Sequence, residues 1–597
     1  MCPDPCAAFA GSSRRRPRPP TRTALRSSVL PSSAETTALP RRPAARAVPP
    51  AACDVLVVGG GINGCGITRD LAGRGASVVL CEKDDLASHT SSASTKLIHG
   101  GLRYLEHYEF GLVKKALAER EGLLCSAPHI MWPLRFVMPH DSAMRPAWMI
   151  RAGLFLYDHL ARRKVLPGSR RIDLRRHKVG QPLKARFTKG FVYSDGWVDD
   201  ARLVALCAVD AAERGATVLT RTRCTRAERG AAVWTVTLES EAGGVHRITA
   251  RALVNATGPW AAEFLRTQAG LPQTHTLRLI KGSHIVVAKL FDHRHAYIFQ
   301  NADRRIIFAI PYEGDFTLVG TTDVEHRGAI GEAAIDTAEI DYLCEQVSRY
   351  FAKPVLPKDV VWSYSGVRPL LEDESSDASA VTRDYRLELD APAGAAPLLS
   401  VWGGKITTFR KLGEEAADTL MAGPLADAAG APAADAARRG AWTGGAFLPG
   451  GDLSAWIGPP LRPDTDFTRF EQALRVRHAE LPPALLHRYA RCYGSRIDLL
   501  LGGADDLGVE VAPGVFEAEL VYLRDHEWAT RVDDVLWRRT KLGLHLTESD
   551  RARVAAWWAV NGGATAHVPG AVGEPASART APATDSAVAT TAATPCS

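Results

Sequence analysis

The glycine-rich segment Gly59–Gly64 constrains the fold of this chain more than any other feature of its 597 residues. It has the spacing GxGxxG, it follows the short apolar run Cys53–Val58, and a helical pattern through Leu71 comes directly after it. A second apolar run, Ala76–Cys81, then predicts a complete strand–helix–strand unit. In such a unit the glycines permit a tight turn and let backbone amides approach a pyrophosphate at the start of the helix. The sequence therefore predicts an α/β fold that binds a dinucleotide.

An acidic residue at the end of the second predicted strand strengthens this interpretation. Glu82 lies 21 residues after Gly61, where a carboxylate would bind a ribose 2′-hydroxyl and favour a cofactor without a 2′-phosphate over NADP. We expect Gly59, Gly61 and Gly64 to form the turn beside the pyrophosphate. A glycine-rich turn that binds no ligand is the structural alternative.

Three later segments favour FAD over NAD. A run of small polar residues, Ser88–Lys96, leads into Leu97–Tyr104, which is too apolar and too rich in glycine for a flexible linker. The segments Asn255–Trp260 and Val401–Thr408 each place glycine directly after a short predicted strand. The second of them leads into a predicted helix, Lys411–Leu420, whose N-terminus could face the electron-rich edge of a flavin. The cofactor residues predicted from these segments are Ser92, Ser94, Thr95, Lys96, Leu97, Thr257, Gly258, Gly403, Lys405 and Thr407.

Composition and charge narrow the class of protein. With 46% hydrophobic and 23% charged residues, the chain is typical of globular proteins, and its length predicts two or three domains. The net charge of +7 resides in residues 1–50, and the rest of the chain carries 64 basic and 64 acidic residues, which argues against a nucleic-acid partner. No apolar stretch is long enough to span a membrane. The 11 cysteines include no CxxC pair, so neither a disulfide framework nor a metal site is expected.

The two ends of the chain differ from the part between them. Residues 1–51 are rich in Pro, Arg and Ser, and residues 562–597 are rich in Ala, Thr and Pro, so both are predicted to be disordered. The leader is either a dispensable extension or a targeting segment, although its prolines oppose the amphipathic helix that mitochondrial targeting needs.

Between the ends, two patterns indicate further domains. Ile306–Ile310 and Phe316–Val319 flank a turn and predict an antiparallel hairpin. From about residue 465 to 560, helical patterns such as Glu517–Trp528 and Asp533–Leu542 follow one another without strand signals. We therefore expect a separate antiparallel sheet and a helical C-terminal domain.

Several long motifs, in order along the chain, carry a family resemblance. They are Thr90–Phe110, Tyr193–Leu203, Leu279–Val287, Gly320–Asp323, Tyr364–Leu370 and Thr382–Tyr385. On these motifs, residues 54–561 closely resemble the FAD-dependent respiratory glycerol-3-phosphate dehydrogenases, within the glycine-oxidase-like flavoproteins. The Arg-rich leader and the Ala/Thr-rich tail have no counterpart in the bacterial pattern of that family.

The resemblance implies an architecture with definite bounds. It implies a Rossmann-like FAD-binding domain, an inserted substrate domain with a mixed or antiparallel sheet, and an all-helical C-terminal cap. The expected bounds are 52–126, 190–265 and 357–425 for the FAD-binding domain, 127–189 and 266–356 for the substrate domain, and 440–561 for the cap.

The resemblance also implies an activity and a location. The family oxidises sn-glycerol 3-phosphate to dihydroxyacetone phosphate, transfers hydride to FAD and passes electrons to a membrane quinone. It implies a peripheral enzyme on the cytoplasmic face of the cell membrane, and a homodimer. The alternatives are an oxidase that reduces oxygen, an amine-oxidising relative and a non-catalytic FAD-binding scaffold. Pro146–Tyr157 has the composition of an interfacial helix, although a helix packed in the core could have the same composition.

The reaction requires cations for a phosphate dianion and a base for the C2 hydroxyl. By resemblance, the substrate residues are Arg103, Tyr104, His284, Arg368, Arg383 and Lys405. Arginine suits the phosphate because its planar fork binds two oxygens, although a single arginine is more often part of a surface ion pair. His284 is the first choice for the base, since a neutral imidazole can take the hydroxyl proton, and His99 competes with it. Arg368 and Lys405 complete the predicted catalytic set, and Lys405 could stabilise an alkoxide.

Overall fold

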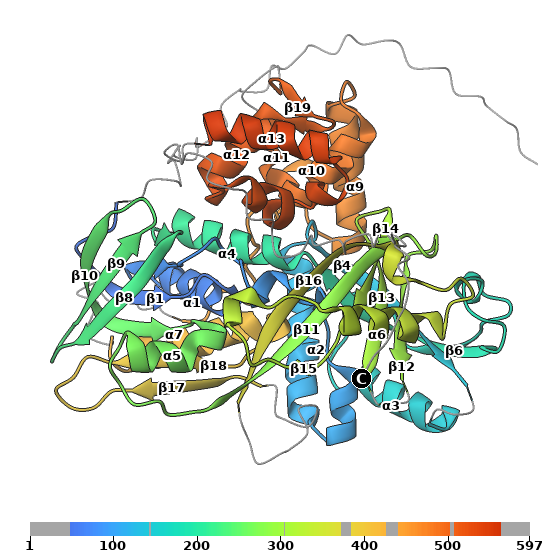
Figure 1. The fold of residues 1–597 in the computed structure, drawn as a ribbon, viewed down its shortest axis with the longest axis horizontal. Helices are drawn as coiled ribbons and strands as arrows, with labels where there is room; N and C mark the ends of the chain where they lie inside the picture. The colour runs from blue at the N-terminus through green and yellow to red at the C-terminus, as the bar shows by residue number, and fades with distance from the viewer. Residues whose placement is uncertain are drawn as a thin grey trace, which may run out of the picture. The chain divides into compact units, whose positions relative to one another are not determined.

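The structure, a computed structural model, describes residues 48–141, 145–301, 303, 305–371, 384–425, 440–501 and 507–562 (Figure 1). The expectations for the leader and the tail fall almost entirely outside these residues, and the prediction for Arg383 falls outside them as well. None of the described helices is both long enough and apolar enough to cross a membrane.

Sheet A is built around the predicted strand–helix–strand unit. Its eight strands are β1 (Ala52–Val58), β2 (Val78–Cys81), β7 (Thr217–Leu219), β8 (Thr222–Arg229), β9 (Trp234–Ser240), β10 (Val245–Asn255), β17 (Arg386–Asp390) and β18 (Leu398–Trp402). The centre of the sheet is parallel, in the order β18-β10-β1-β2-β7. Within it, Val55 pairs with Val78 on one side and with Ala252 on the other.

Both faces of sheet A are covered, which explains the continuous apolar run of β1. Val55 and Val57 belong to a core shared with α1 (Ile62–Gly73), α4 (Asp200–Glu213) and α7 (Phe409–Ala422). Leu56 points to the opposite face, where β9 and α5 (Ala261–Thr267) cover it. The alternation follows from the two-residue period of a strand.

Sheet B is the predicted second sheet and is mainly antiparallel. Its ten strands are β3 (Leu97–Ile98), β4 (Met131–His140), β5 (Arg170–Asp173), β6 (Lys189–Val198), β11 (Leu277–Ala288), β12 (His295–Gln300), β13 (Ile306–Tyr312), β14 (Phe316–Gly320), β15 (Val324–Glu325) and β16 (Val360–Leu371). The expected hairpin is confirmed as β13 and β14, in which Ile310 pairs with Leu318. One face of the sheet packs on α6 (Thr337–Ser348), and the other packs on α2 (Phe110–Ser126) and α3 (Ala147–His159).

The pairing of strands does not follow the expected domain bounds everywhere. β6 and β16 fall in stretches assigned to the FAD-binding domain, yet β6 pairs with β4 and β16 pairs with β11 in sheet B. Hydrophobic periodicity shows that a segment is a strand but does not specify its partner. The domain bounds themselves stay a prediction.

The C-terminal region is helical, as expected, with one exception. Its helices are α8 (Ser454–Ile457), α9 (Pro463–Arg477), α10 (Pro483–Tyr493), α11 (Ile497–Leu501), α12 (Glu517–Glu527), the π-helix η12 (Asp534–Arg539) and α13 (Glu548–Asn561). The expectation of no strand is wrong for β19 (Glu510–Ala512) and β20 (Val515–Phe516), which form a small hairpin. These strands are too short to give an alternating pattern in the sequence.

Candidate active site

A pocket opens at the carboxyl ends of β1, β2, β10 and β18, which are neighbours in the parallel part of sheet A. Open α/β sheets bind their ligands at this edge. Six of the predicted cofactor residues line the pocket: Gly59, Gly61, Glu82, Thr257, Gly258 and Gly403. The glycine-rich turns that follow three strands distant in sequence therefore meet at one site.

The turn after β1 requires glycine for physical reasons. Gly59 has φ +112°, and a Cβ at this position would lie 2.5 Å from the carbonyl oxygen of Ala256. A Cβ at Gly64 would clash with the carbonyl oxygen of Gly59, so its absence lets α1 begin close to β1. Gly61 and Ile62 line the pocket, which places the first turn of α1 and the positive end of its dipole at the pocket wall.

Glu82 occupies the expected position at the end of β2. The backbone amides of Gly60 and Asp84 donate to its buried carboxylate at 2.6 Å and 2.9 Å. Burial raises the pKa of this carboxyl, and the two amide hydrogen bonds oppose that shift. Because Glu82 also lines the pocket, its place agrees with a ribose contact, which stays a prediction.

The run Ser88–Lys96 is attached to α4. The buried ammonium group of Lys96 donates to Asp200 at 2.6 Å and to the carbonyl oxygen of Ser92 at 3.1 Å. The hydroxyl of Ser94 donates to the same carboxylate at 2.7 Å. Asp200 therefore fixes this run to the first turn of α4, and the side chains of Ser94 and Lys96 hold the loop without lining the pocket.

The other predicted cofactor positions are not part of the lining. Leu97 is buried in β3, and the hydroxyl of Thr407 is 3.2 Å and 3.3 Å from the backbone nitrogen and oxygen of His99. Lys405 follows Gly404, which does line the pocket, and its Nζ lies 3.8 Å from the centre of the Tyr104 ring.

His284 lies in the interior of sheet B with one ring nitrogen engaged. Its Nε2 is 2.9 Å from Oγ1 of Thr95, and its ring stacks on Tyr364 at 4.8 Å. Nδ1 has no hydrogen-bond partner among the described residues. Burial lowers the pKa of His284 well below its usual range, and the charges of Lys96 and Arg368 lower it further. The imidazole is therefore neutral near pH 7, and Nδ1 can accept a proton when Nε2–H donates to Thr95.

Arg368 shares a face of sheet B with His284. In the antiparallel pair of β11 and β16, His284 lies opposite Tyr364, Gly282 opposite Gly366, and Ile280 opposite Arg368. Alternate residues of a strand point to the same face. The two glycines thus separate the histidine from the arginine, and a Cβ at Gly282 would clash with the Arg368 guanidinium. The missing side chains give Arg368 the space that it occupies.

A carboxylate and a carbonyl hold the guanidinium of Arg368. Its Nη1 is 2.7 Å from Asp323, its Nη2 donates to the carbonyl oxygen of Thr322 at 2.8 Å, and 28% of the side chain is exposed. Asp323 lies in the motif Gly320–Asp323, but no pattern around it predicts this role. Arg103 lies in the 3-10 helix η3 (Leu102–His107), and its side chain lies outside the described part of the chain.

Several residues of the pocket were missed by reasoning from the sequence. The hydroxyl of Ser91 accepts from the backbone amide of Ile62 at 3.0 Å, and the Nζ of Lys83 lies 3.7 Å from the centre of the Trp260 ring. Ser91 and Trp260 fall within the segments predicted to contact the cofactor, so the sequence indicated these segments but not these two residues. Lys83 has no distinguishing pattern around it.

The lining fits FAD. Oδ1 of Asn63 is buried without a hydrogen-bond partner among the described residues, although Asn63 lines the pocket. At Gly258, a Cβ would meet no atom within 4 Å, so that wall is open to a ligand. Lys83 supplies a positive charge and the first turn of α1 supplies a positive dipole for a pyrophosphate. A dinucleotide cofactor such as FAD binds where a glycine-rich turn and a helix N-terminus meet at the carboxyl ends of a parallel sheet.

Comparisons with known families agree with this site. Residues 54–410 match the family model described as FAD dependent oxidoreductase, and residues 443–559 match the C-terminal domain of alpha-glycerophosphate oxidase. The chain belongs to the FAD-dependent oxidoreductase family. FAD is therefore its cofactor.

Three curated relatives match most of the chain. It is 51% identical over 507 residues to a glycerol-3-phosphate dehydrogenase of Pseudomonas aeruginosa, which covers 84% of this chain and 94% of the relative. It is 49% identical over 508 residues to the aerobic glycerol-3-phosphate dehydrogenase of Escherichia coli, with 84% and 97% covered. It is also 49% identical over 513 residues to the D-erythritol 1-phosphate dehydrogenase of Brucella abortus, with 85% and 98% covered.

A solved structure has the same fold. The glycerol-3-phosphate dehydrogenase from Bacillus halodurans, complexed with FAD, superposes with a TM-score of 0.62 at 24% identity, over 85% of this chain and 94% of that one. The expected resemblance to the FAD-dependent glycerol-3-phosphate dehydrogenases and the expected fold class are confirmed.

Proposed function

We propose that the protein oxidises sn-glycerol 3-phosphate to dihydroxyacetone phosphate. The observation that carries the proposal is a neutral, buried His284 on the same face of sheet B as Arg368. The strand that carries Arg368 reaches the pocket for FAD at Pro369. The imidazole of His284 can take a proton from a hydroxyl, and the guanidinium of Arg368 can bind the phosphate of the same substrate. Two relatives that are 51% and 49% identical and are named as glycerol-3-phosphate dehydrogenases support the choice of substrate.

The side chains divide the chemistry between them. Arg368 binds the phosphate dianion through its guanidinium, which Asp323 and the carbonyl oxygen of Thr322 hold in position. Nδ1 of His284 takes the proton of the C2 hydroxyl while Thr95 holds the ring through Nε2. Bound FAD would supply the acceptor for the hydride that leaves C2. Lys405 stabilises the negative charge that develops on the C2 oxygen.

The substrate itself needs a direct test, because one relative is named for D-erythritol 1-phosphate. Both compounds are polyol monophosphates with a hydroxyl that can be oxidised, so the pocket must distinguish them by chain length. We expect kcat/KM for sn-glycerol 3-phosphate to exceed that for D-erythritol 1-phosphate by about tenfold or more, the discrimination that a few unpaired hydroxyl contacts produce. The reverse ratio would make the four-carbon phosphate the substrate.

A membrane quinone is the electron acceptor in this proposal. The relative from Escherichia coli is named as an aerobic dehydrogenase, and that name supports a respiratory acceptor over direct use of oxygen. Reoxidation of the reduced flavin by a water-soluble quinone analogue should be much faster than by air-saturated buffer. Equal rates would favour the oxidase alternative. A homodimer stays a prediction.

Peripheral contact with the inner face of the cell membrane also forms part of the proposal. On α3, Trp148 is 70% exposed and Phe155 is 56% exposed, and Met149 and Leu156 are exposed beside them. Only Leu154 and Tyr157 of this helix are buried. Large apolar side chains exposed along one helix are typical of an interfacial helix, which favours this interpretation over a helix packed in the core.

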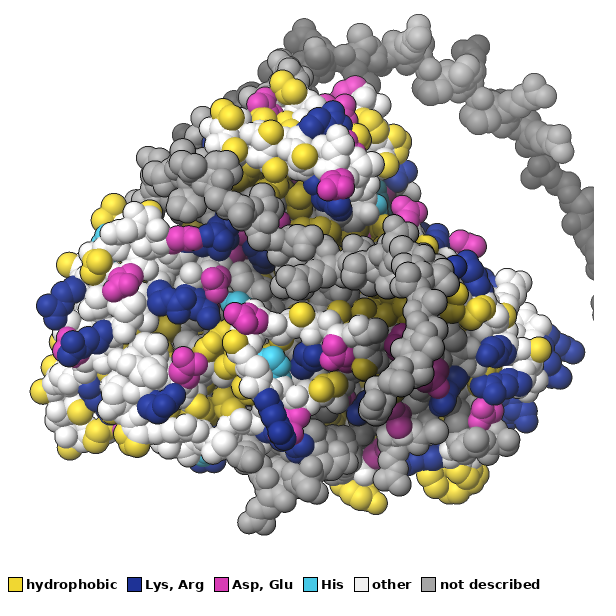
Figure 2. Space-filling view, viewed as in Figure 1, with side chains coloured by type: hydrophobic (Ala, Val, Ile, Leu, Met, Phe, Trp, Pro, Cys, Tyr) yellow, Lys and Arg dark blue, Asp and Glu magenta, His cyan; other side chains and the backbone are white. Residues whose placement is uncertain are grey.

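A basic segment follows α3 in the chain. Residues 162–178 contain Arg162, Arg163, Lys164, Arg170, Arg171, Arg175, Arg176 and Lys178, and their single acidic residue is Asp173. Figure 2 shows apolar side chains at the lower right edge of the viewed face, where α3 lies in Figure 1, and Lys and Arg side chains along the right edge above it. Positive charge next to exposed apolar groups is what an anionic membrane surface attracts.

A further inference from the structure

The C-terminal region contacts a loop that borders the cofactor pocket and that takes no part in the proposed chemistry. The loop Glu82–Ser91 follows β2, and seven of its residues line the pocket: Glu82, Lys83, Ala87, Ser88, His89, Thr90 and Ser91. Asp85, in the middle of this loop, points away from the pocket lining and is fully buried.

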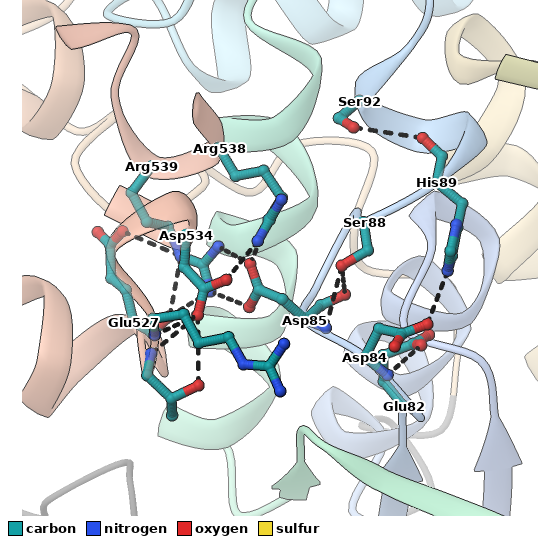
Figure 3. Close-up of polar contacts among 12 residues, drawn as sticks. Glu82, Asp84, Asp85, Ser88, His89, Ser92, Glu527, Asp534, Arg538 and Arg539 are labelled. Carbon is teal, nitrogen blue, oxygen red and sulfur yellow. Dashed lines mark hydrogen bonds and ion pairs between the residues drawn. The ribbon is translucent and has the colours of Figure 1, made fainter. Parts of the chain in front are cut away.

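Two consecutive arginines of the C-terminal region hold Asp85 (Figure 3). Arg539 donates from both of its terminal nitrogens to the two carboxylate oxygens, at 2.7 Å each. Arg538 donates from Nε to one of these oxygens at 2.6 Å. A carboxylate that accepts three charge-assisted hydrogen bonds in a dry site is fixed in position and orientation.

The same cluster is anchored within the C-terminal region. Arg539 also donates to the carbonyl oxygen of Glu527 at 2.7 Å, and Arg538 pairs with Asp534. Asp534 in turn accepts from Arg221 at 2.8 Å, and the backbone amide of Arg221 donates to the carbonyl oxygen of Asp84 at 2.9 Å. The loop is therefore held on two sides, through the side chain of Asp85 and the backbone of Asp84.

A series of hydrogen bonds connects Asp85 with residues that line or border the pocket. The backbone amide of Asp85 donates to the hydroxyl of Ser88 at 3.0 Å, and that hydroxyl donates to the carbonyl oxygen of Asp85 at 2.8 Å. The amide of Ala87 then donates to the carbonyl oxygen of Gly60 at 3.2 Å, in the glycine-rich turn. A displacement of Asp85 would consequently move both the loop and the turn that border the pocket.

From these contacts we infer that Asp85 is a positioning residue for FAD, and that Arg538 and Arg539 of the C-terminal region set the affinity for the cofactor by fixing the loop Glu82–Ser91. The C-terminal region thereby acts on the cofactor site without touching the ligand itself. Order imposed on the loop before binding removes an entropic cost from the binding step.

The test uses a variant that should fold. Arg538→Gln removes one hydrogen bond to Asp85, while Arg539 still pairs with Asp85 and Arg221 still pairs with Asp534. Both buried carboxylates that Arg538 contacts therefore keep a cationic partner in this variant. The holoenzyme is diluted in steps, free FAD is separated by ultrafiltration and its fluorescence gives a dissociation constant. We expect this constant to rise about fivefold or more.

Glu213→Gln is the matched control. It removes an ion pair of the same length, 2.6 Å, between Arg496 of the C-terminal region and the end of α4, at a place that does not border the pocket. The melting temperatures of the two variants should fall by similar amounts, but the FAD dissociation constant of Glu213→Gln should stay within about twofold of the wild type. Arg538→Lys, which keeps the charge, should restore part of the affinity.

Two results would overturn the inference. One is an unchanged FAD dissociation constant in Arg538→Gln, and the other is an equal rise in Glu213→Gln. Either result would mean that the arginines only attach the C-terminal region to the rest of the chain. The measurement involves no polyol phosphate, so its outcome is independent of the proposed substrate.

Discussion

At the scale of single residues, His284 combines burial, a fixed Nε2 and an Nδ1 without a hydrogen-bond partner among the described residues. His284→Ala should lower the rate of flavin reduction by sn-glycerol 3-phosphate by about 10² or more, because the hydroxyl proton loses its acceptor. Stopped-flow absorbance under anaerobic conditions measures this rate. The oxidised flavin spectrum should be unchanged, which separates lost chemistry from lost cofactor. A wild-type rate would assign the base to another residue.

Arg368 should act on substrate binding more than on chemistry. Arg368→Ala should raise KM for sn-glycerol 3-phosphate by at least about 30-fold, because a charge-assisted phosphate contact is lost. Steady-state kinetics with a saturating artificial acceptor measure the effect. A variant in which kcat falls and KM stays constant would place Arg368 in the transition state instead.

The pH dependence of the activity should reflect both His284 and Arg368. In the enzyme without substrate, the pKa of His284 lies well below its usual value of 6.5. The base therefore stays deprotonated as pH falls through 6.5, and activity is lost only at lower pH. The charge of Arg368 is one cause of this low pKa. In Arg368→Gln the pKa should therefore rise and the acid limb of log kcat/KM should move to higher pH. An acid limb that stays in place would separate the titrating group from Arg368.

At the scale of elements, α3 should decide attachment to membranes. Replacement of both Trp148 and Phe155 by Glu puts two charges on its exposed face and should reduce co-sedimentation with anionic vesicles by about tenfold or more. Both side chains are exposed, so activity with a soluble acceptor should be retained. Wild-type binding by the double variant would exclude α3 as the contact.

At the scale of the whole molecule, the sequence specifies the cofactor half of the site better than the substrate half. Gly59, Gly61 and Glu82 could be placed from the sequence because a parallel strand, a tight turn and a helix N-terminus make local demands on residue type. The partner of a strand is set by contacts distant in sequence, so the place of β16 in sheet B could not be predicted. For the same reason, the contact of Asp85 with Arg539, 454 positions further on, leaves no local signal.

In the run Ser88–Lys96, some residues line the pocket and others do not. The small polar residues of this run predicted cofactor contacts, and Ser91 does lie in the lining. Ser94 and Lys96, however, bind Asp200, because a buried ammonium and a buried carboxylate require each other as partners. Local composition predicts that a segment is polar and close to a ligand, but not which of its side chains face the ligand.

The visible spectrum of the purified protein tests the proposed function most directly. The oxidised flavin spectrum is recorded under anaerobic conditions before and after addition of sn-glycerol 3-phosphate, with D-erythritol 1-phosphate in a parallel sample. We expect rapid bleaching by sn-glycerol 3-phosphate and rapid recovery when a quinone analogue is added. A flavin spectrum that sn-glycerol 3-phosphate leaves unchanged would contradict the proposed function.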